Sequence, residues 1–284
     1  MKPIVAIVAP GSMGAAVGAR LAESGVQVLT TLAGRSAASR ERARLAGIVE
    51  VPERDLPQAD FVLSIVPPGA ALAFAERAAS WLALAPRKPV FVDCNAVSPA
   101  TVARIAARIA ATGAPFVDAG IIGGPPRKGV DGPNFYASGA EAARFAVLAR
   151  HGLTIRVLEG PVGAASALKM CFAGITKGLT AVGAAMLLAS VRCGVDAALR
   201  AELAESQPQL LGGFVRGIPA MFPKAYRWVA EMSEIAAFAR PADDPAAAIF
   251  EGASRLYERL ARDLAGEGIE KRVLEGFLGA AKQP

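Results

Sequence analysis

Lys169 lies in the longest apolar stretch of the chain, residues 162–191, which consists largely of alanine and glycine and also contains Lys177. An amine in such a segment either reaches along a helix to solvent or acts as a proton donor and acceptor. Proton donation is what a carbonyl oxygen requires when hydride reaches its carbon. Lys169 is therefore a candidate catalytic residue, and on the residue pattern alone both interpretations stay open.

A glycine-rich segment near the start of the chain could bind a dinucleotide. It has the layout GxGxxG with Ala9 in the first glycine position, followed by Gly11, Ser12, Met13 and Gly14. In a turn from a strand into a helix, one glycine lets the backbone approach a pyrophosphate and the next permits close packing of helix on strand. Such turns also occur without a ligand. The position directly after a predicted first strand favours cofactor binding by residues 11–14.

The segment after the second predicted strand indicates which nicotinamide cofactor is preferred. A carboxylate there would bind the ribose 2′-hydroxyl of NAD, but residues 31–36 contain none. Arg35 can instead pair with a 2′-phosphate through its planar guanidinium, while Ser36 caps the next helix and donates to the same phosphate. Arg40 lies nearby. NADP (NADPH) is the predicted cofactor, and an ordinary solvated helix face is the alternative for both arginines.

The elements that must position these residues follow from the hydrophobic pattern. Up to Leu158, short β-branched or aromatic runs alternate with amphipathic segments, which is typical of βαβ units. We expect an α/β fold in which residues 1–160 form a Rossmann domain with a doubly wound parallel sheet. The expected strands are residues 4–8, 26–31, 61–65, 90–93, 116–119, 134–138 and 154–158.

After Gly160 the strand signals stop, and residues 161–284 are predicted to form an all-α domain. We expect breaks at Gly194, at Gly212 and Gly213, and around the prolines of 219–223 and 241–245. A long interdomain helix over about residues 163–193 would measure roughly 45 Å. Alanine and glycine lie on all its faces, so neighbouring helices must pack closely around it. One copy offers few candidates, and we expect a homodimer.

Composition excludes several other classes of function. The net charge is +6, but the arginines are scattered and no aromatic-basic cluster accompanies them, so no nucleic-acid partner is expected. His151 is the only histidine, which excludes a metal held by two imidazoles, and we predict no metal. Three cysteines without a CxxC pair indicate reduced thiols. With charged lysines in the apolar stretch and no signal sequence, we expect a cytoplasmic protein without a membrane span.

Three further segments carry a resemblance to a known family. They are DCNAVSP at 93–99, DAGIIGG at 118–124, and GPVG at 160–163 with Lys169 downstream. With the glycine-rich turn, and in this order, they resemble the β-hydroxyacid dehydrogenases, which include 3-hydroxyisobutyrate dehydrogenase and the NAD-binding domain of 6-phosphogluconate dehydrogenase. The later segment YRWVAEM at 226–232, with Lys177 and Gly178, is similar to a bacterial branch that has a DUF1932-type C-terminal domain.

The resemblance implies an NADP-dependent oxidoreductase that acts on a small hydroxy acid or its aldehyde or keto acid. Lys169 matches the catalytic lysine of the family. Asn95 stands where the family places Ser or Asn against substrate and nicotinamide, so its amide could bind a hydroxyl or carboxylate. Backbone N–H groups of Gly123 and Gly124 could hold the substrate carboxylate. The predicted cofactor contacts also include Val66 and Pro67.

The chain departs from the family pattern after the lysine. The family commonly has Asn there, whereas this chain has Cys171, Phe172 and Ala173, which predicts a more apolar pocket with a polar contact from Thr176 or Lys177. Ser98, which precedes a proline, is expected to be a helix N-cap and not a ligand.

Two alternatives to the dehydrogenase remain. An imine reductase has the same two-domain architecture but typically replaces the lysine with Asp, Tyr or another residue, so Lys169 counts against it. A non-catalytic NADPH-binding protein is favoured by the missing Asn and disfavoured by the presence of Lys169 and Asn95.

Overall fold

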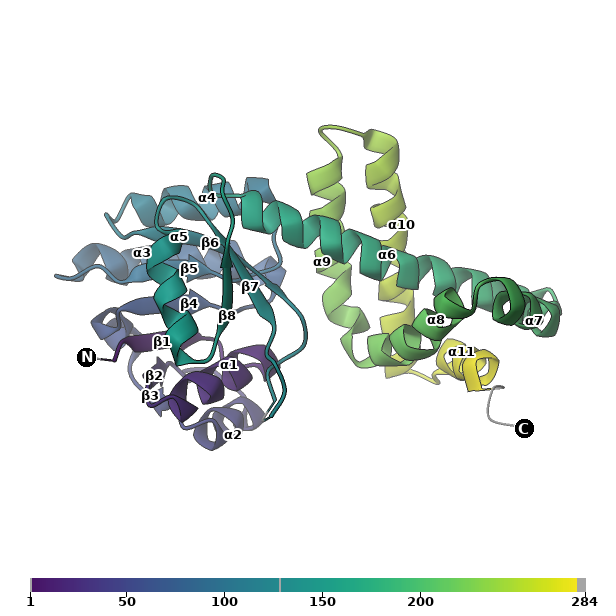
Figure 1. Ribbon diagram of the computed structural model, residues 1–284, viewed down its shortest axis with the longest axis horizontal. Coiled ribbons are helices and arrows are strands. Elements are labelled where there is room, and N and C mark those ends of the chain that lie inside the picture. The colour runs from purple at the N-terminus through teal and green to yellow at the C-terminus, as the bar shows by residue number, and fades with distance from the viewer. Residues whose placement is uncertain (1, 128, 280–284) are drawn as a thin grey trace. The chain divides into compact units, whose positions relative to one another are not determined.

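The computed structural model describes residues 2–127 and 129–279 (Figure 1). The chain divides into two compact units, residues 1–170 and 171–284. The division lies inside a helix, not at residue 160 as predicted. The reason is that the backbone of Gly163 and Ser166, at the start of this helix, is hydrogen-bonded to Asp118 of the first unit.

The first unit contains an eight-stranded sheet in the order β3-β2-β1-β4-β5-β6-β7-β8. The strands are β1 (Ile4–Val8), β2 (Gln27–Thr30), β3 (Val49–Glu50), β4 (Phe61–Ser64), β5 (Val90–Asp93), β6 (Phe116–Ile122), β7 (Asn134–Ser138) and β8 (Thr154–Val157). All pairs are parallel except β6 with β7, which is antiparallel. The prediction of a parallel sheet is wrong at this pair, because a loop without a crossover helix joins the two strands.

The seven predicted strands are all present. β6 extends three residues beyond its predicted end because its last residues pair with β7 as far as Ile122 with Asn134. The sequence pattern missed β3, which has two exposed residues and therefore leaves no alternation of buried and exposed positions.

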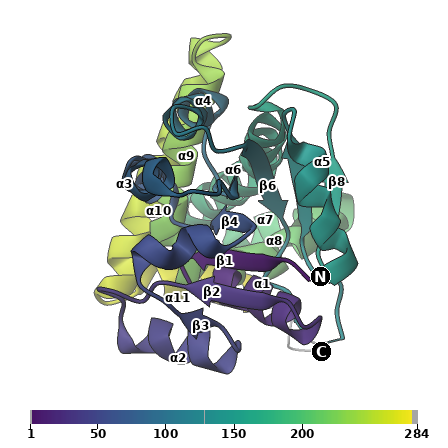
Figure 2. The ribbon, with the colours of Figure 1, turned by 90° about the vertical axis from the view of Figure 1, so that its left-hand side faces the viewer.

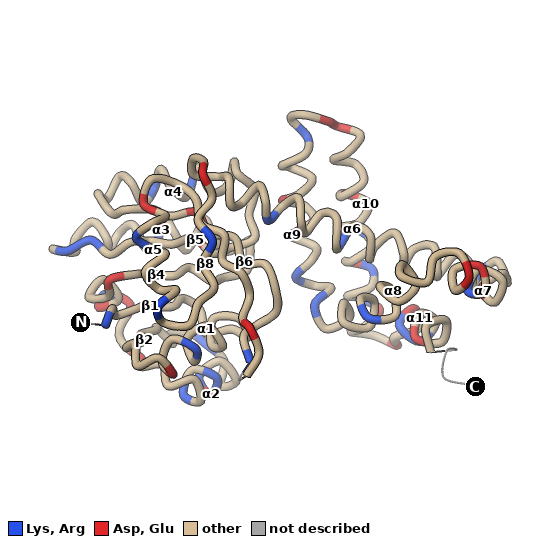
Figure 3. The backbone as a smooth tube through the Cα atoms, viewed as in Figure 1, with Lys and Arg blue, Asp and Glu red and all other residues tan. Residues whose placement is uncertain are grey.

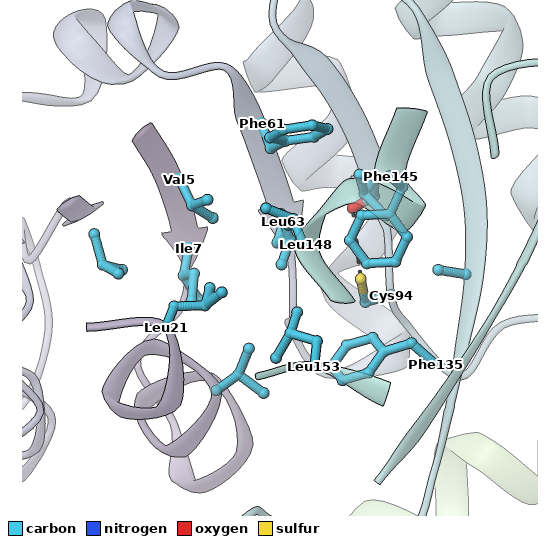
Figure 4. Close-up of a cluster of buried hydrophobic side chains, with 14 of the residues drawn as sticks. Val5, Ile7, Leu21, Phe61, Leu63, Cys94, Phe135, Phe145, Leu148 and Leu153 are labelled. Carbon is cyan, nitrogen blue, oxygen red and sulfur yellow. Dashed lines mark hydrogen bonds between the residues drawn. The ribbon is translucent and has the colours of Figure 1, made fainter. Parts of the chain in front are cut away.

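Helices cover both faces of the sheet (Figure 2). One face packs against α1 (Ser12–Glu23), α2 (Ala37–Leu45) and α5 (Ala142–Phe145), with Leu21, Phe135 and Phe145 in the shared core (Figure 4). The other face packs against α3 (Ala71–Leu84) and α4 (Pro99–Ala110), with Phe74 and Phe91. Short 3₁₀ turns are η1 (Glu53–Gln58), η2 (Pro68–Ala70) and η3 (Ala146–His151). The sheet is therefore buried on both sides, as doubly wound folds require.

The order of strands reverses at β1. The chain proceeds from β1 outward through β2 to β3, and then returns to β4 on the other side of β1 before continuing to β5 and β6. In such sheets the crevice for ligands lies at the carboxyl ends of the strands beside this reversal. Residues that follow β1, β2, β4, β5 and β6 are therefore brought to one edge.

The described part of the second unit is helical. It contains most of α6 (Ala164–Arg192), then α7 (Asp196–Ser206), α8 (Pro208–Met221), the turn η4 (Phe222–Lys224), α9 (Ala225–Ala239), α10 (Asp244–Ala265) and α11 (Ile269–Gly279). The long helix and the breaks at Gly194 and at 241–245 are confirmed. The break predicted at Gly212 and Gly213 is wrong, because α8 runs through both and buries Leu211 and Phe214 on either side. The interruption lies at Gln207 instead.

Helices in this unit pack closely against α6, as its glycines predicted. A Cβ atom at Gly183 would lie 2.4 Å from the Phe214 ring, and one at Gly174 would lie 3.2 Å from the Phe250 ring. Among described residues, α6 is the one helix long and apolar enough to cross a membrane, but a core helix of a soluble protein also has these properties. The contacts at its glycines are those of a core helix.

Lys177 is held inside the second unit by neighbouring helices. Its ammonium forms an ion pair with Glu231 and lies 5.0 Å from the centre of the Trp228 ring. The Tyr257 hydroxyl donates to the Lys177 carbonyl at 2.5 Å, and Trp228 packs edge-on against the Tyr257 ring. The expected role of Lys177 as a polar substrate contact is therefore replaced by a packed ion pair that joins α6 to α9.

Candidate active site

The predicted site residues of the first unit meet at the carboxyl edge of the sheet. The glycine-rich turn follows β1, Arg35 and Ser36 follow β2, Val66 and Pro67 follow β4, Asn95 follows β5, and Gly123 and Gly124 follow β6. Lys169 lies just over one turn into α6, which begins beside β6. Six separate segments of the sequence thus contribute to one region.

The glycine-rich turn has the geometry that a pyrophosphate requires. A Cβ at Gly14 would lie 2.2 Å from the Ala9 carbonyl oxygen, so only glycine lets α1 start this close to β1. A Cβ at Gly11 would have no atom within 4 Å, which leaves open space beside the backbone. Gly11 is the N-cap of α1, no side chain caps the helix, and no acidic residue lies in its first turn. The N–H groups there suit an anion.

The side chains of the turn differ in their surroundings. Ser12 is exposed. Met13 packs against the hydrophobic core, so only its backbone is suited to contact a cofactor. The residues present therefore fit a dinucleotide through main-chain groups, with Ser12 as the side chain that faces solvent.

The loop after β2 leads into α2, whose basic residues are blue in Figure 3. Ser36 is the N-cap of α2 and accepts from the Ser39 N–H, as predicted. Arg40 is held by the Leu32 carbonyl at 2.8 Å and by Glu50 at 3.4 Å. These contacts give Arg40 a structural role. The Arg35 side chain is half-buried and no carboxylate pairs with it among the described residues.

Arg42 was not predicted as a site residue. Its guanidinium donates to the Pro10 carbonyl in the glycine-rich turn at 3.4 Å and to the Ser39 hydroxyl at 2.9 Å. The spacing of Ser36, Ser39 and Arg42 places them along one side of α2 and is the signal that could have found them. The arginine brought to the turn by the fold is thus Arg42 and not Arg40.

Asn95 joins the ends of β4 and β5. Its side-chain oxygen accepts from the Val66 N–H at 2.7 Å, and its amide donates to the Ser64 hydroxyl at 2.8 Å and to Asp93 at 2.5 Å. Because the Val66 N–H is a donor, the orientation of the amide is fixed. Asn95 is 4% exposed. The Asn95 amide, which was predicted to contact substrate, is thus bonded within the protein and positions the turn at Val66.

Asp93 and Asp118 lie directly opposite each other on β5 and β6. Burial raises the pKa of Asp93 to about 7, with the Asp118 charge acting in the same direction and the Asn95 hydrogen bonds acting against both. One Asp93 oxygen has no hydrogen-bond partner. Burial also raises the pKa of the Cys94 thiol. Cys94 is therefore not suited to act as a nucleophile near neutral pH.

Lys169 lies against β6 at Gly120. A Cβ at Gly120 would lie 3.1 Å from the Lys169 Cβ and 2.9 Å from the Ala165 carbonyl oxygen. The Lys169 side chain is half-buried. Of the residues that follow it, Ala173 is buried, whereas Cys171 and Phe172 are exposed.

Gly123 and Gly124 end β6 and are both exposed. Gly123 has a φ of +128°, and a Cβ there would lie 3.0 Å from the Pro133 backbone. A side chain at Gly124 would meet no atom within 4 Å. The first glycine is therefore required by the turn, and the second leaves open space beside the backbone.

Other residues that the sequence singled out can also be compared with the structure. Ser98 is the N-cap of α4 and accepts from the Thr101 N–H, as expected. His151 ends η3 and lines a hollow with Lys2 and Asp60, which precede β1 and β4. This is the amino edge of the sheet, away from the site. All three cysteines are free thiols. The described residues contain no cluster of His, Cys, Asp or Glu that could hold a metal.

Alanine substitutions at the two glycines of the turn should affect different properties, stability at Gly14 and cofactor binding at Gly11. Gly14→Ala should lower the free energy of unfolding by about 2 kcal/mol, because its Cβ would overlap a backbone oxygen. Gly11→Ala should keep wild-type stability and weaken NADPH binding about tenfold by filling the open space. Thermal melts and fluorescence titration measure both. An unchanged NADPH affinity in Gly11→Ala would contradict the assignment.

Asp93 predicts a dependence of stability on pH. Its pKa is about 7 when folded against 3.8 in the unfolded chain, so the folded state holds an extra proton between these values and loses stability as pH rises through them. Asp93→Asn keeps the acceptor for Asn95 and removes the titration. Relative to wild type, the variant should gain up to about 4 kcal/mol between about pH 4 and pH 8. Denaturant unfolding at several pH values tests this, and parallel curves for the two proteins would refute it.

Comparison with known proteins agrees with this geometry. Residues 4–149 match the model for the NAD binding domain of 6-phosphogluconate dehydrogenase, and residues 191–260 match a domain of unknown function, DUF1932. An uncharacterized 28.5 kDa protein from Methanothermus fervidus is 34% identical over 159 residues. That match covers 55% of this chain and 59% of the relative.

Solved structures resemble the chain over nearly its whole length. A conserved protein of unknown function, reported as structurally similar to 3-hydroxyacid dehydrogenases, is 32% identical with a TM-score of 0.69 and covers 93% of this chain and 98% of its own. Mycobacterium tuberculosis 3-hydroxyisobutyrate dehydrogenase has 19% identity, a TM-score of 0.70 and full coverage of both chains. An imine reductase from Myxococcus stipitatus has 20% identity, a TM-score of 0.58 and coverage of 98% and 100%. The last two share the fold.

The glycine-rich turn, the reversal of strand order at β1 and the match over residues 4–149 lead to one conclusion. The chain belongs to the family defined by the NAD binding domain of 6-phosphogluconate dehydrogenase.

Proposed function

We propose that this protein is an NADP-dependent oxidoreductase that transfers hydride between NADP(H) and a small hydroxy acid or its aldehyde or keto acid. The observation that carries the proposal is the position of Lys169 against Gly120 of β6, the strand that the exposed pair Gly123 and Gly124 directly follows. A proton donor and main-chain groups for a carboxylate thus belong to one strand and the helix packed on it. The glycine-rich turn supplies the cofactor site at the same edge.

The preference for NADP rests on charge at the end of β2. Residues 31–36 contain no carboxylate to accept a ribose 2′-hydroxyl. Arg35 is available for a 2′-phosphate, Ser36 lies beside it, and Arg42 approaches from α2 to the turn. Planar guanidinium groups bind phosphate through paired hydrogen bonds. Solved neighbours of the same fold include complexes with NADP⁺, with NADPH and with NAD⁺, so the preference rests on these residues of the chain.

When bound at the glycine-rich turn, NADPH would supply the hydride for the carbonyl carbon. The Lys169 ammonium donates a proton to the carbonyl oxygen as negative charge develops there, and in the reverse direction the amine takes the hydroxyl proton. N–H groups of Gly123 and Gly124 orient the substrate carboxylate. Asn95 holds the Val66 N–H and so keeps the loop after β4 in place beside the cofactor.

Substitution of Lys169 separates catalysis from binding. Lys169→Ala should lower kcat at least 100-fold with a panel of aldehyde acids and keep the NADPH Kd, because general acid catalysis typically contributes about 10²–10⁴ in rate. Arg35→Ala should weaken NADPH binding about tenfold and leave NADH binding unchanged. Arg44→Ala is the matched control, since Arg44 pairs with Glu41 on the same helix.

The measurement is oxidation of NADPH together with fluorescence titration. Full turnover by Lys169→Ala would refute the role of the lysine. Turnover only with cyclic imines would replace the dehydrogenase by an imine reductase. Tight NADPH binding without turnover of any substrate would replace it by a non-catalytic binding protein.

We further propose a homodimer formed through the exposed face of α6. Phe172, Ile175, Leu179, Val182 and Met186 follow helical spacing and are between 45% and 71% exposed. A continuous apolar stripe of this kind is typical of a surface that another helix covers.

The free thiols of Cys171 and Cys193 suit a reducing compartment, and we propose that the protein is cytoplasmic.

Replacement of one stripe residue tests the dimer. Leu179→Glu should shift the protein from dimer to monomer in sedimentation experiments, because it places a charge at the centre of the apolar stripe. Leu84→Glu, at an exposed leucine that ends α3, is the control and should keep the wild-type state. A monomeric wild-type protein at micromolar concentration would refute the proposal.

A further inference from the structure

The start of α6 is capped by residues of the sheet. Asp118 accepts from the Gly163 N–H at 2.8 Å and the Ser166 N–H at 3.0 Å through one oxygen, and from the Ser166 hydroxyl at 2.7 Å through the other. The Ser138 hydroxyl donates to Asp118 at 3.1 Å and accepts from the Ala165 N–H at 3.0 Å. The first N–H groups of a helix usually bond to the side chain of an adjacent N-cap residue. In α6 they bond instead to Asp118 of β6 and Ser138 of β7.

The Asp118 carboxylate is completely buried. A buried charge must be compensated, and here four donors, two of them backbone N–H groups at the positive end of a helix, surround it. Ser138 and Ser166 are also buried. Because these bonds run between different elements, they fix the position and the rotation of the first turn of α6 relative to the sheet.

Strand β6 also determines how closely α6 packs against the sheet. Asp118 and Gly120 are two residues apart on β6 and therefore face the same side of the sheet. At Gly120 the missing Cβ leaves the space that the Ala165 carbonyl and the Lys169 Cβ occupy. One face of β6 thus holds the helix start through Asp118 and makes room for the lysine at Gly120.

We propose that Asp118 is a positioning residue for Lys169: with Ser138 and Gly120 it seats the first turn of α6 so that the amine meets the substrate oxygen. This inference rests on the proposed function, in which Lys169 transfers the proton. Its physical basis is that proton transfer requires contact within hydrogen-bond distance, and a shift of about 1 Å can lower the rate about 100-fold.

The first test uses NMR to monitor the environment of the Lys169 side chain and does not require turnover. Lysines are converted to ¹³C-dimethyl-lysine and observed by NMR, and Lys169→Arg assigns the signal of Lys169. Asp118→Asn replaces a double acceptor by an amide that cannot accept from all four donors, so the Lys169 signal should move. The control is Asp243→Asn, which makes the same substitution at the N-cap of α10, where the amide oxygen can still accept from the Ala246 N–H, and it should leave this signal unchanged.

The second test separates kcat from KM. In Asp118→Asn, kcat should fall about tenfold or more, while the substrate KM and the NADPH Kd change less than about threefold. Ser138→Ala keeps the carboxylate, removes one bond from it and should give a smaller decrease in kcat. It also covers the case in which Asp118→Asn does not fold. Gly120→Ala should likewise lower kcat, because its Cβ would press on the lysine turn.

The outcomes distinguish this inference from the proposed function. A Lys169 signal that is unchanged in folded Asp118→Asn, or in Ser138→Ala if the first variant does not fold, overturns the positioning role. An inactive Lys169→Ala together with full kcat in the same variants overturns it too, and leaves the proposed function standing. Full kcat in Lys169→Ala overturns the proposed function and the inference with it.

Discussion

The buried carboxylate of Asp118 links the sheet to the helix that carries the candidate catalytic lysine. It receives four hydrogen bonds from β7 and the start of α6, so that a helix beginning 46 residues later in the chain has a defined starting point on β6. Its environment also affects a neighbour, because the Asp118 charge contributes to the raised pKa of Asp93 on β5. Asp93 in turn holds Asn95, and Asn95 holds the loop after β4. The edge of the sheet is therefore one connected network.

The polar residues of the first unit therefore fall into two groups, one bonded within the protein and one proposed to bind ligands. Asp93, Asn95 and Asp118 are each at most 4% exposed and are engaged with the protein itself. The groups proposed to meet a ligand are main-chain N–H groups at glycines and the side chains of Lys169 and Arg35. A rigid edge with few outward side chains suits a cofactor that is bound mostly through its phosphates.

Packing in the second, helical unit depends instead on small residues of α6, which let neighbouring helices approach it closely. Gly174 and Gly183 receive aromatic rings from α10 and α8, and the Lys177–Glu231 pair joins α6 to α9. These contacts cover part of the surface of α6. The apolar stripe from Phe172 to Met186 remains exposed, and this exposure motivates the proposed dimer.

The sequence by itself determined the α/β class, seven strands, the long helix and the identity of the glycine-rich turn, because each depends on local periodicity or on a glycine at a fixed spacing. Tertiary structure decided what local patterns do not encode. The antiparallel β7 depends on how the chain returns after β6, and α8 continues through Gly212 and Gly213 because flanking side chains are buried. Likewise, Asn95 and Lys177 are polar residues that the sequence could assign to a ligand, but only folding pairs them with Val66 and Glu231, which lie 29 and 54 positions away along the chain.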